Sequence, residues 1–288
     1  MRRLLVAFLA FGTALQLAAQ SERSQFEAGT IKPASPNLPG GRTGAVPPAG
    51  GPGTADPSRI TYRAATLKTL LMRAYAAEEF QITGPAWLDS ELFEMTATMP
   101  PGTTSDQFRS MLQNLLTERF ELKTHREPKE FSGYSLAVAK NGPKLKESGP
   151  APAASGASAD GPPQLGADGY LVPPQRPGMF LQLTGSGGAR ATFRQVTMET
   201  LATTLQSQLQ RPVSEGTGLM GRYDFVLNFA SQGLNFGRLR IPVSPGDTEP
   251  QPDIAGALQS QLGLRLDPKK STVEVIVVDQ ATKTVKPN

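Results

Sequence analysis

The sequence predicts an α+β protein with two related halves, each of the order β-α-β-β-α-β-β, in which helices cover small, mostly antiparallel sheets. Three observations predict this. Segments with helical periodicity alternate with segments of strand periodicity. The same order of elements occurs twice, so that Thr66 and Thr197 stand at equivalent points before a helix. Stretches rich in Pro, Gly, Ala and Ser separate the periodic segments and are typical of connectors.

The first half, residues 21–147, is predicted from its apolar stripes and its turn residues. Leu67, Leu70, Leu71 and Ala74 recur at helical spacing after Thr66, a residue suited to cap a helix. Over 91–99, one set of alternate residues is apolar (Phe93, Met95, Ala97 and Met99) and the other is mostly polar, which predicts a strand with one buried face. The elements expected here are a strand over 59–62, a helix from Thr66, a strand over 91–99, a helix capped by Thr104 or Ser105, and strands over 119–127 and 134–140.

The second half, residues 189–288, repeats this order. Thr197 precedes a stripe formed by Met198, Leu201, Leu205 and Leu209, and Asp253 precedes a second helix that ends at Gly263. The strands expected in this half cover 192–194, 223–229, 264–266 and 273–279. We therefore expect this half to pack a small sheet against helices in the same way as the first half.

Three stretches interrupt the periodic pattern. Residues 33–57 and 231–252 are predicted to be flexible insertions, and residues 148–188 a low-complexity linker. Each stretch contains too few large apolar residues to offset the entropy lost on ordering the chain.

The N-terminus predicts export. Two arginines after Met1 precede an apolar run that ends in small residues, which is the pattern of a signal peptide over residues 1–20. Polar residues interrupt the run, whereas a membrane helix needs about 20 apolar residues; an uncleaved anchor is the alternative. We therefore expect a periplasmic or secreted protein without a stable membrane anchor. The chain has no cysteine, so disulfides and a lipid-modified cysteine are excluded.

The stretch from Gly216 to Phe225 contains three glycines with G-x-G-x-x-G spacing, the spacing of dinucleotide-binding loops. In such loops the first glycine follows a strand and the last opens a helix, whose N-terminus holds the pyrophosphate. Here a predicted helix precedes the glycines and a strand follows them. The sequence therefore predicts a turn between strands and no cofactor.

The balance and distribution of charged residues disfavour a nucleic-acid-binding protein. Without the two arginines of the signal peptide, the 29 basic residues become 27 against 25 acidic ones, and they are scattered among the acids. We therefore expect no nucleic-acid partner.

His125 is the only histidine and is predicted to lie on a surface strand. No catalytic residue and no metal ligand set is predicted, although carboxylates gather at Glu78, Glu79, Asp89, Glu91 and Glu94, with Asp224 at an equivalent place in the second half.

Two loops carry the candidate contact surface. Trp87 and Leu88 lie in the loop GPAWLDS, and Leu219, Met220 and Tyr223 lie in or next to the glycine-rich loop. A tryptophan in a turn can stack on a sugar or anchor a partner, or it can fold back over its own sheet edge. Exposed apolar residues on both loops would form a plausible contact surface.

Several blocks of sequence carry a resemblance to a known family. These blocks are FEAGTIKP, TLKTLLMRAY, FQITGPAWLDSELFEM, LLTERFELKTHRE, YSLAVAKNGPKLKES, RPVSEGTGLMGRYDFVLNF and QLGLRLDPKKSTVEVIVVD. Together they resemble an uncharacterised family of exported proteins abundant in Acidobacteria. In that family the domain also occurs behind membrane metallopeptidases of the BlaR antirepressor type. The resemblance implies an extracytoplasmic position and a sensing or docking role, and it transfers no catalytic residue.

These observations lead to one expected function and two alternatives. We expect a non-enzymatic interaction or sensing module of the cell envelope or secretome, whose partner is an unknown envelope or secreted protein. The first alternative is binding of a cell-wall glycan or small molecule through Trp87, Tyr223 and nearby carboxylates. The second is an envelope hydrolase that uses Asp89, Glu91, Glu94 or Asp224, which requires these acids to converge and one of them to have a raised pKa. The oligomeric state is not indicated by the sequence.

Overall fold

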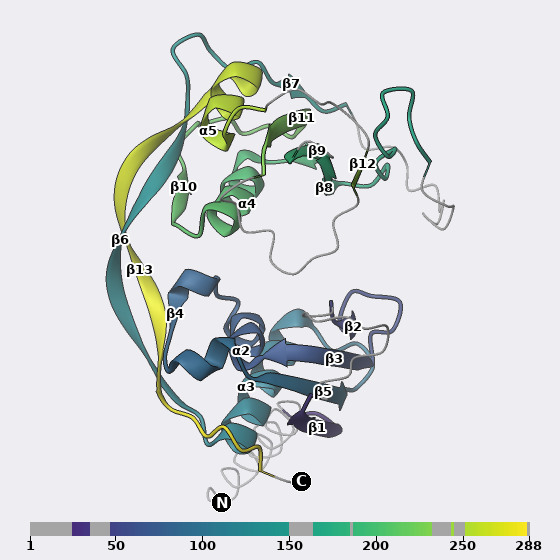
Figure 1. The fold of residues 1–288 in the computed structure, drawn as a ribbon, viewed down its shortest axis with the longest axis vertical. Coiled ribbons are helices and arrows are strands. Elements are labelled where there is room, and N and C mark those ends of the chain that lie inside the picture. The colour runs from purple at the N-terminus through teal and green to yellow at the C-terminus, as the bar shows by residue number, and fades with distance from the viewer. Residues whose placement is uncertain are drawn as a thin grey trace, which may run out of the picture. The chain divides into compact units, whose positions relative to one another are not determined.

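The computed structural model describes residues 25–34, 47–149, 164–184, 187–231, 243–244 and 251–286 (Figure 1). It confirms the predicted α+β class. The chain forms two compact units, and we refer to Met1–Pro128 with Glu274–Asn288 as unit 1 and to Lys129–Val273 as unit 2. The predicted signal peptide lies outside the described residues. Within the described ranges no helix has both the length and the apolar character that a membrane crossing requires.

Unit 1 contains a four-stranded sheet in the order β1-β5-β3-β2, in which every pair is antiparallel. Its strands are β1 (Ala28–Pro33), β2 (Ala49–Gly50), β3 (Arg59–Thr66) and β5 (Leu92–Thr98). In β5 burial alternates along the strand as the sequence predicts, with Phe93, Met95 and Ala97 buried. These side chains pack against α2 (Leu67–Tyr75) and α3 (Ser105–Phe120) in one apolar core.

The two helices of unit 1 begin at the expected capping residues. The Thr66 hydroxyl accepts a hydrogen bond from the Thr69 amide at 3.1 Å, which satisfies a backbone donor at the start of α2. Thr104, and not Ser105, caps α3 and forms a capping box with Gln107. The predicted helix starts are thus confirmed, because a cap is formed by residues that are close together in the sequence.

Unit 2 contains a five-stranded sheet in the order β12-β8-β9-β11-β7. Its strands are β7 (Lys146–Glu147), β8 (Gly178–Thr184), β9 (Gly188–Val196), β11 (Tyr223–Ala230) and β12 (Val243–Ser244). Thr197 caps α4 (Met198–Leu209), and Asp253 caps α5 (Ile254–Ala257), which continues as a π-helical turn (Leu258–Leu262). Apolar residues of both helices and of the sheet form a core that belongs to this unit.

Strand β8 corrects part of the predicted linker. Residues 178–184 lie inside the stretch 148–188, yet they pair antiparallel with β9 over six residues. The sequence did not predict this strand because its buried residues are the polar Gln182 and Thr184, so it lacks the usual pattern of buried apolar residues, and Pro- and Gly-rich segments surround it. Two residues of the predicted insertion 33–57 also form β2, whereas most of the predicted insertion 231–252 lies outside the described residues.

Two long strands replace the four short strands that the sequence predicts. The sequence predicts separate strands over 119–127 and 134–140, but Lys123–Val138 form one strand, β6, and the first two residues of the predicted strand, 119 and 120, belong to the end of α3. Likewise Leu264–Gln280 form the single strand β13. A proline lies inside each strand, at 128 and 268. Proline is compatible with a strand where its missing N–H faces no neighbouring strand.

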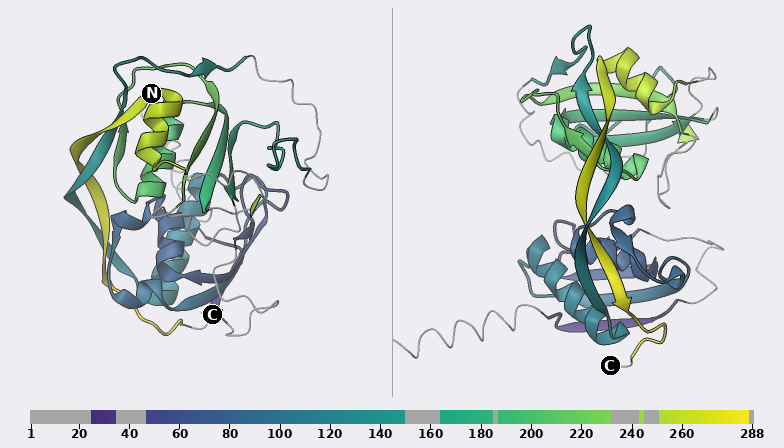
Figure 2. Two further views of the ribbon diagram at one scale, coloured as in Figure 1. Left: turned by 45° about the horizontal axis from the view of Figure 1, so that its top comes forward. Right: turned by 90° about the vertical axis from the view of Figure 1, so that its left-hand side faces the viewer.

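Strands β6 and β13 are neighbours in a third sheet of the order β10-β6-β13-β4, and they coil about each other (Figure 2). In unit 1, β13 pairs parallel with β4 (Ile82–Thr83). In unit 2, β6 pairs parallel with β10 (Val213–Glu215). Each long strand therefore contributes residues to both units.

The units and the predicted halves divide the chain by different criteria. The halves, 21–147 and 189–288, follow the order of elements along the sequence, whereas the units group residues by contact. Because β6 and β13 each belong to both units, the C-terminal residues 274–288 belong to the same unit as the N-terminal sheet. That the halves arose by duplication stays a prediction.

Candidate functional site

The glycine-rich stretch forms a loop between two strands of unit 2, and we call residues 216–222 the Met220 loop. It follows β10, whose residues pair in parallel with Tyr134, Ser135 and Leu136 of β6. It ends at Tyr223, where β11 begins and pairs with both β9 and β7. Both ends of the loop are therefore held by sheet hydrogen bonds.

Two of the three glycines have a structural reason to be there. A Cβ atom at Gly216 would lie 2.5 Å from the Ser135 hydroxyl oxygen, so the backbone approaches β6 more closely than a side chain permits. Gly218 has a φ of +70°, a conformation that glycine adopts without steric cost. Gly221 precedes the strand β11 and not a helix. The predicted turn between strands is confirmed, and the loop lacks the helix N-terminus of a pyrophosphate site.

The carboxylate of Glu215, the last residue of β10, binds the backbone of the Met220 loop. The Glu215 carboxylate accepts hydrogen bonds from the amides of Thr217 at 2.6 Å and Gly218 at 3.2 Å, and from the Thr217 hydroxyl. The hydroxyl hydrogen bond, followed by those from the two amides, lowers the pKa of Glu215 below its usual value. The backbone donors that would hold a phosphate are thus already used by a carboxylate, which also fixes the shape of the loop.

At the tip of the loop two apolar residues have opposite environments. Leu219 is partly buried and packs against the core of unit 2. Its amide donates to the Thr217 hydroxyl at 3.1 Å. The next residue, Met220, is 95% exposed. Arg222 then donates to the Gln195 carbonyl at 2.9 Å. A fully solvated methionine thus stands between two anchored residues.

The structure places the five predicted contact residues in two groups. Trp87 and Leu88 lie in a short 3-10 helix of unit 1 (Ala86–Asp89), and Leu219, Met220 and Tyr223 belong to unit 2. Leu88 is 2% exposed and Tyr223 is 5% exposed, so these two do not present their side chains to a partner. For both the prediction was wrong, because apolar character at a loop does not distinguish an exposed residue from one that anchors the loop to the core.

Trp87 packs against its own unit. It is partly buried and lies against the core of unit 1. Its carbonyl accepts the amides of Ser90 and Glu91, which closes the short helical turn. A Cβ atom at Gly84 would lie 2.5 Å from the Leu88 side chain, so this glycine lets the turn pack tightly. The alternative in which Trp87 folds back over its own unit is the one that this packing favours.

The acids of the hydrolase alternative form ordinary ion pairs and hydrogen bonds. In unit 1, Asp89 pairs with Lys68 at 3.1 Å, Glu91 with Lys283 at 3.3 Å, and Glu94 with Lys32 at 3.4 Å. In unit 2, Asp224 accepts the Gln195 amide at 2.6 Å and the Ser148 hydroxyl at 2.8 Å. Each carboxylate thus has a local structural partner. Among the described residues no three His, Asp or Glu side chains are arranged to hold a metal ion.

Comparison with known proteins adds a family. Residues 68–281, from α2 to the end of β13, match the family described as protein of unknown function (DUF3738). The chain belongs to this family. No curated protein and no solved structure matches the chain. The matched DUF3738 region contains the Met220 loop, Trp87 and residues of both units.

The single histidine of this DUF3738 chain has an acidic partner that the sequence analysis did not identify. His125 on β6 lies 2.9 Å, through Nδ1, from both carboxylate oxygens of Asp279 on β13. Its Nε2 lies 3.8 Å from Glu127. The hydrogen bond with Asp279 is the main reason that the pKa of His125 is raised above its ordinary value of 6.5. Because the two residues are 154 positions apart in the sequence, only the pairing of β6 with β13 brings them together.

We expect the His125–Asp279 pair to stabilise the protein at acid pH and to weaken as pH rises. When a histidine has a higher pKa in the folded than in the unfolded protein, its protonation stabilises the fold. This stabilisation is complete below the unfolded pKa and is lost as the pH rises through the folded pKa. Asp279→Asn is expected to lower the pKa of His125 towards the ordinary value. Because the chain has one histidine, its imidazole NMR signal reports this titration without assignment.

Glu127→Gln is the matched control, since Glu127 is a weaker cause of the raised pKa. It is expected to shift the titration less than Asp279→Asn. An equal shift in both variants would show that general charge near the strand, and not the hydrogen bond, sets the pKa.

Proposed function

We propose that this protein is a non-enzymatic interaction module, and that the Met220 loop is the part that contacts its partner. The observation that supports this most is the full exposure of Met220 on a loop with a fixed shape. Single exposed apolar residues are common and need no explanation by themselves. Met220 differs because it lies between two held residues: Leu219 packs against the core, and the Arg222 side chain donates a hydrogen bond to the Gln195 carbonyl.

A fixed loop favours binding for a physical reason. Ordering a flexible loop on association costs free energy, and a loop that is ordered beforehand avoids most of that cost. Methionine suits such a contact because its unbranched thioether adapts to irregular apolar pockets. The partner therefore needs a small apolar pocket with polar groups at its rim, which fits a protein surface better than an extended carbohydrate.

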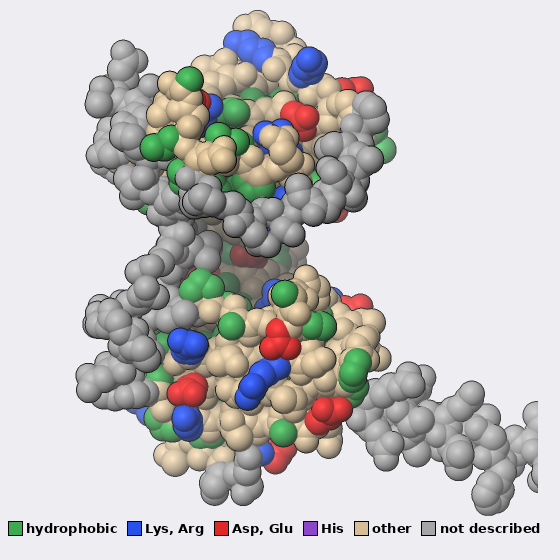
Figure 3. Space-filling view, turned by 90° about the vertical axis from the view of Figure 1, so that its right-hand side faces the viewer, with side chains coloured by type: hydrophobic (Ala, Val, Ile, Leu, Met, Phe, Trp, Pro, Cys, Tyr) green, Lys and Arg blue, Asp and Glu red, His purple; other side chains and the backbone are tan. Residues whose placement is uncertain are grey.

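We infer that the module acts outside the cytoplasm as a periplasmic or secreted protein. Support comes from the basic and apolar pattern of the N-terminal sequence. The resemblance to exported proteins of Acidobacteria, and to domains behind BlaR-type metallopeptidases, also fits an extracytoplasmic sensing or docking role. The proposed partner is accordingly another envelope or secreted protein and not a nucleic acid. On the face shown in Figure 3, basic and acidic side chains are interspersed and form no basic patch.

Photocrosslinking in an envelope extract tests this proposal. A photoreactive amino acid replaces Met220 in one variant and Met179 in another, because Met179 is also an exposed methionine of unit 2, on β8. We expect a discrete protein adduct from position 220 and not from position 179. The partner identified in the adduct is then purified, and its affinity for the wild-type protein and for Met220→Ala is measured.

Met220→Ala is expected to weaken binding about tenfold or more if Met220 is a central anchor. Met220→Leu keeps the apolar volume and serves as the conservative control. Equal crosslinking from both positions, or an unchanged affinity in Met220→Ala, would argue against the Met220 loop as the contact.

A further inference from the structure

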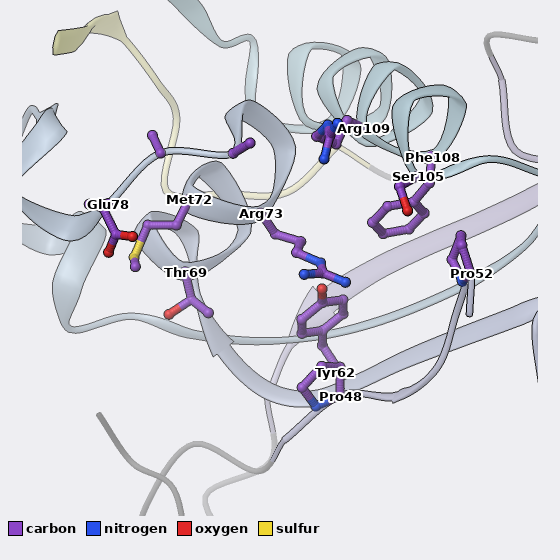
Figure 4. A pocket seen from close by; sticks show the side chains of 12 residues that line it. Pro48, Pro52, Tyr62, Thr69, Met72, Arg73, Glu78, Ser105, Phe108 and Arg109 are labelled. Atoms are coloured by element: carbon purple, nitrogen blue, oxygen red, sulfur yellow. The ribbon is translucent and has the colours of Figure 1, made fainter. Parts of the chain in front are cut away.

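A pocket of about 470 Å³ opens in unit 1 between β3, α2, the start of α3 and the loop that follows β2 (Figure 4). This volume lies within the range of roughly 300 to 1,000 Å³ that is typical of small-molecule sites. The pocket contains none of the residues in the Met220 loop or the Trp87 turn, and the sequence analysis did not single it out. Its polar groups are unusual enough to indicate a ligand.

The first unusual group is Tyr62 on β3. Its side chain is 3% exposed and lines the pocket, and its buried hydroxyl makes no hydrogen bond of standard geometry to the described residues. The Arg73 guanidinium interacts with this hydroxyl as a donor outside standard geometry, so the hydroxyl's own proton is left without an acceptor among the described residues. Burial raises the pKa of Tyr62 above its ordinary value of 10.0, with Arg73 acting in the opposite direction. The hydroxyl therefore keeps its proton at neutral pH and has that proton to donate.

The second unusual group is Arg73 on α2, whose guanidinium reaches towards the Tyr62 hydroxyl (Figure 4). In the part of the chain that the structure describes, Arg73 has no carboxylate partner. The other charged residues that line the pocket are already engaged. Arg109 pairs with Asp106, and the Glu78 carboxylate belongs to a capping box. Among the residues that line the pocket, Arg73 is thus the cation without a carboxylate partner, and it lies beside a buried donor, while the Glu78 carboxylate adds a negative charge to the same lining.

The remaining walls are largely apolar. The Phe108 ring of α3 and the Met72 side chain of α2 face the pocket, together with Pro48 and Pro52 (Figure 4). Thr69 and Ser105 add hydroxyl groups, and Ser105 is the first residue of α3, a long helix whose N-terminus favours negative charge. The Arg73 guanidinium next to apolar side chains suits a ligand that has a negatively charged group at one end and an apolar body.

We propose that this pocket binds a small carboxylate with an apolar body, with Arg73 and the Tyr62 hydroxyl holding the carboxylate and Phe108 and Met72 contacting the body. A monoanion fits better than a phosphate dianion, because the pocket offers one unpaired cation and a second negative charge would be left without compensation. A carboxylate accepts two parallel hydrogen bonds from a guanidinium fork, and the Tyr62 hydroxyl is placed to donate a further one. The proposal does not depend on the Met220 loop.

Calorimetric titration of the full chain with 3-phenylpropionate tests the proposal. Its neutral analogue, 3-phenylpropionamide, has nearly the same shape without the charge. We expect the carboxylate to bind and the amide to bind about tenfold to a hundredfold more weakly, as hydrogen bonds to a charged group contribute strongly. NMR shifts at the Tyr62, Arg73 and Phe108 amides check that the probe binds in the pocket.

Two variants and one control separate the roles. Arg73→Met removes the charge and keeps most of the aliphatic chain, and Tyr62→Phe removes the unpartnered hydroxyl without emptying the core. Each is expected to weaken binding of 3-phenylpropionate about tenfold or more. Arg63→Met removes an exposed arginine from the same strand and is expected to leave binding unchanged. Absence of binding to the wild-type protein, equal binding of the amide, or equal affinity in all variants would overturn the proposal.

Discussion

Deletion of residues 274–288 at the C-terminus is expected to unfold unit 1, which contains the N-terminal sheet, while unit 2 stays folded. Hydrogen exchange followed by mass spectrometry measures this peptide by peptide. We expect α2, β5 and α3 to lose their protection, and β9, α4 and β11 to keep most of theirs. If the predicted halves were the folding units, the deletion would instead reduce hydrogen-exchange protection in the second half, residues 189–288.

The expectation follows from what the C-terminal residues bury. Ile276 is 4% exposed and pairs with Ile82 of β4, and Val278 is 5% exposed in the core of unit 1. Beyond β13, the amide of Thr282 donates to the carbonyl of Phe120 at 2.8 Å. Each fully buried aliphatic side chain contributes about 1.5 to 3 kcal/mol. Their joint loss is of the same order as the roughly 5 to 15 kcal/mol that stabilises a typical protein.

Two point variants on the same strand provide the control. Ile276→Ala removes a buried side chain from the part of β13 in unit 1, and Leu264→Ala removes one from the part in unit 2. Each is expected to cost about 2 to 5 kcal/mol and to lower protection within its own unit. Loss of protection in unit 2 first, after the C-terminal deletion or in Ile276→Ala, would show that the division into units is wrong.

The elements that sequence reasoning predicted correctly depend on local chemistry. Thr66, Thr197 and Asp253 cap their helices through hydrogen bonds to an amide three residues later, and this spacing is visible in the sequence. Gly263 ends the last helix with a φ of +65° for an equally local reason. The joining of short strands into β6 and β13 was missed because it depends on which strand lies alongside each proline, and the sequence does not show this.

The candidate sites show the same limit. Loop position and apolar character predicted Met220 as a contact residue, but they predicted Leu88 and Tyr223 equally, because burial depends on neighbours that are distant in the sequence. Tyr62 reads as an ordinary residue of an alternating strand. It becomes notable only when α2 places Arg73 beside its hydroxyl and leaves that hydroxyl without a standard hydrogen bond.

Phe120→Ala is expected to be the most destabilising single core substitution that we propose. Phe120 is fully buried at the end of α3, and its ring contacts Phe93 of β5 edge to face, with centroids 4.9 Å apart. Truncation removes this contact and leaves a cavity between the helix and the sheet. Such changes typically cost about 3 to 5 kcal/mol, which corresponds to a fall in melting temperature of roughly 10 to 20 °C. Thermal unfolding followed by circular dichroism measures the shift.

Phe80→Ala is the matched control in the same unit. Phe80 lies in a short 3-10 helix (Glu79–Gln81), is partly exposed and does not belong to the core cluster. Its truncation opens no internal cavity, so we expect a cost of about 1 kcal/mol or less. Because both variants remove the same side chain, their difference measures how much more the buried ring at position 120 contributes to stability than the partly exposed ring at position 80. Equal melting temperatures in the two variants would mean that the Phe93–Phe120 contact does not hold α3 on the sheet.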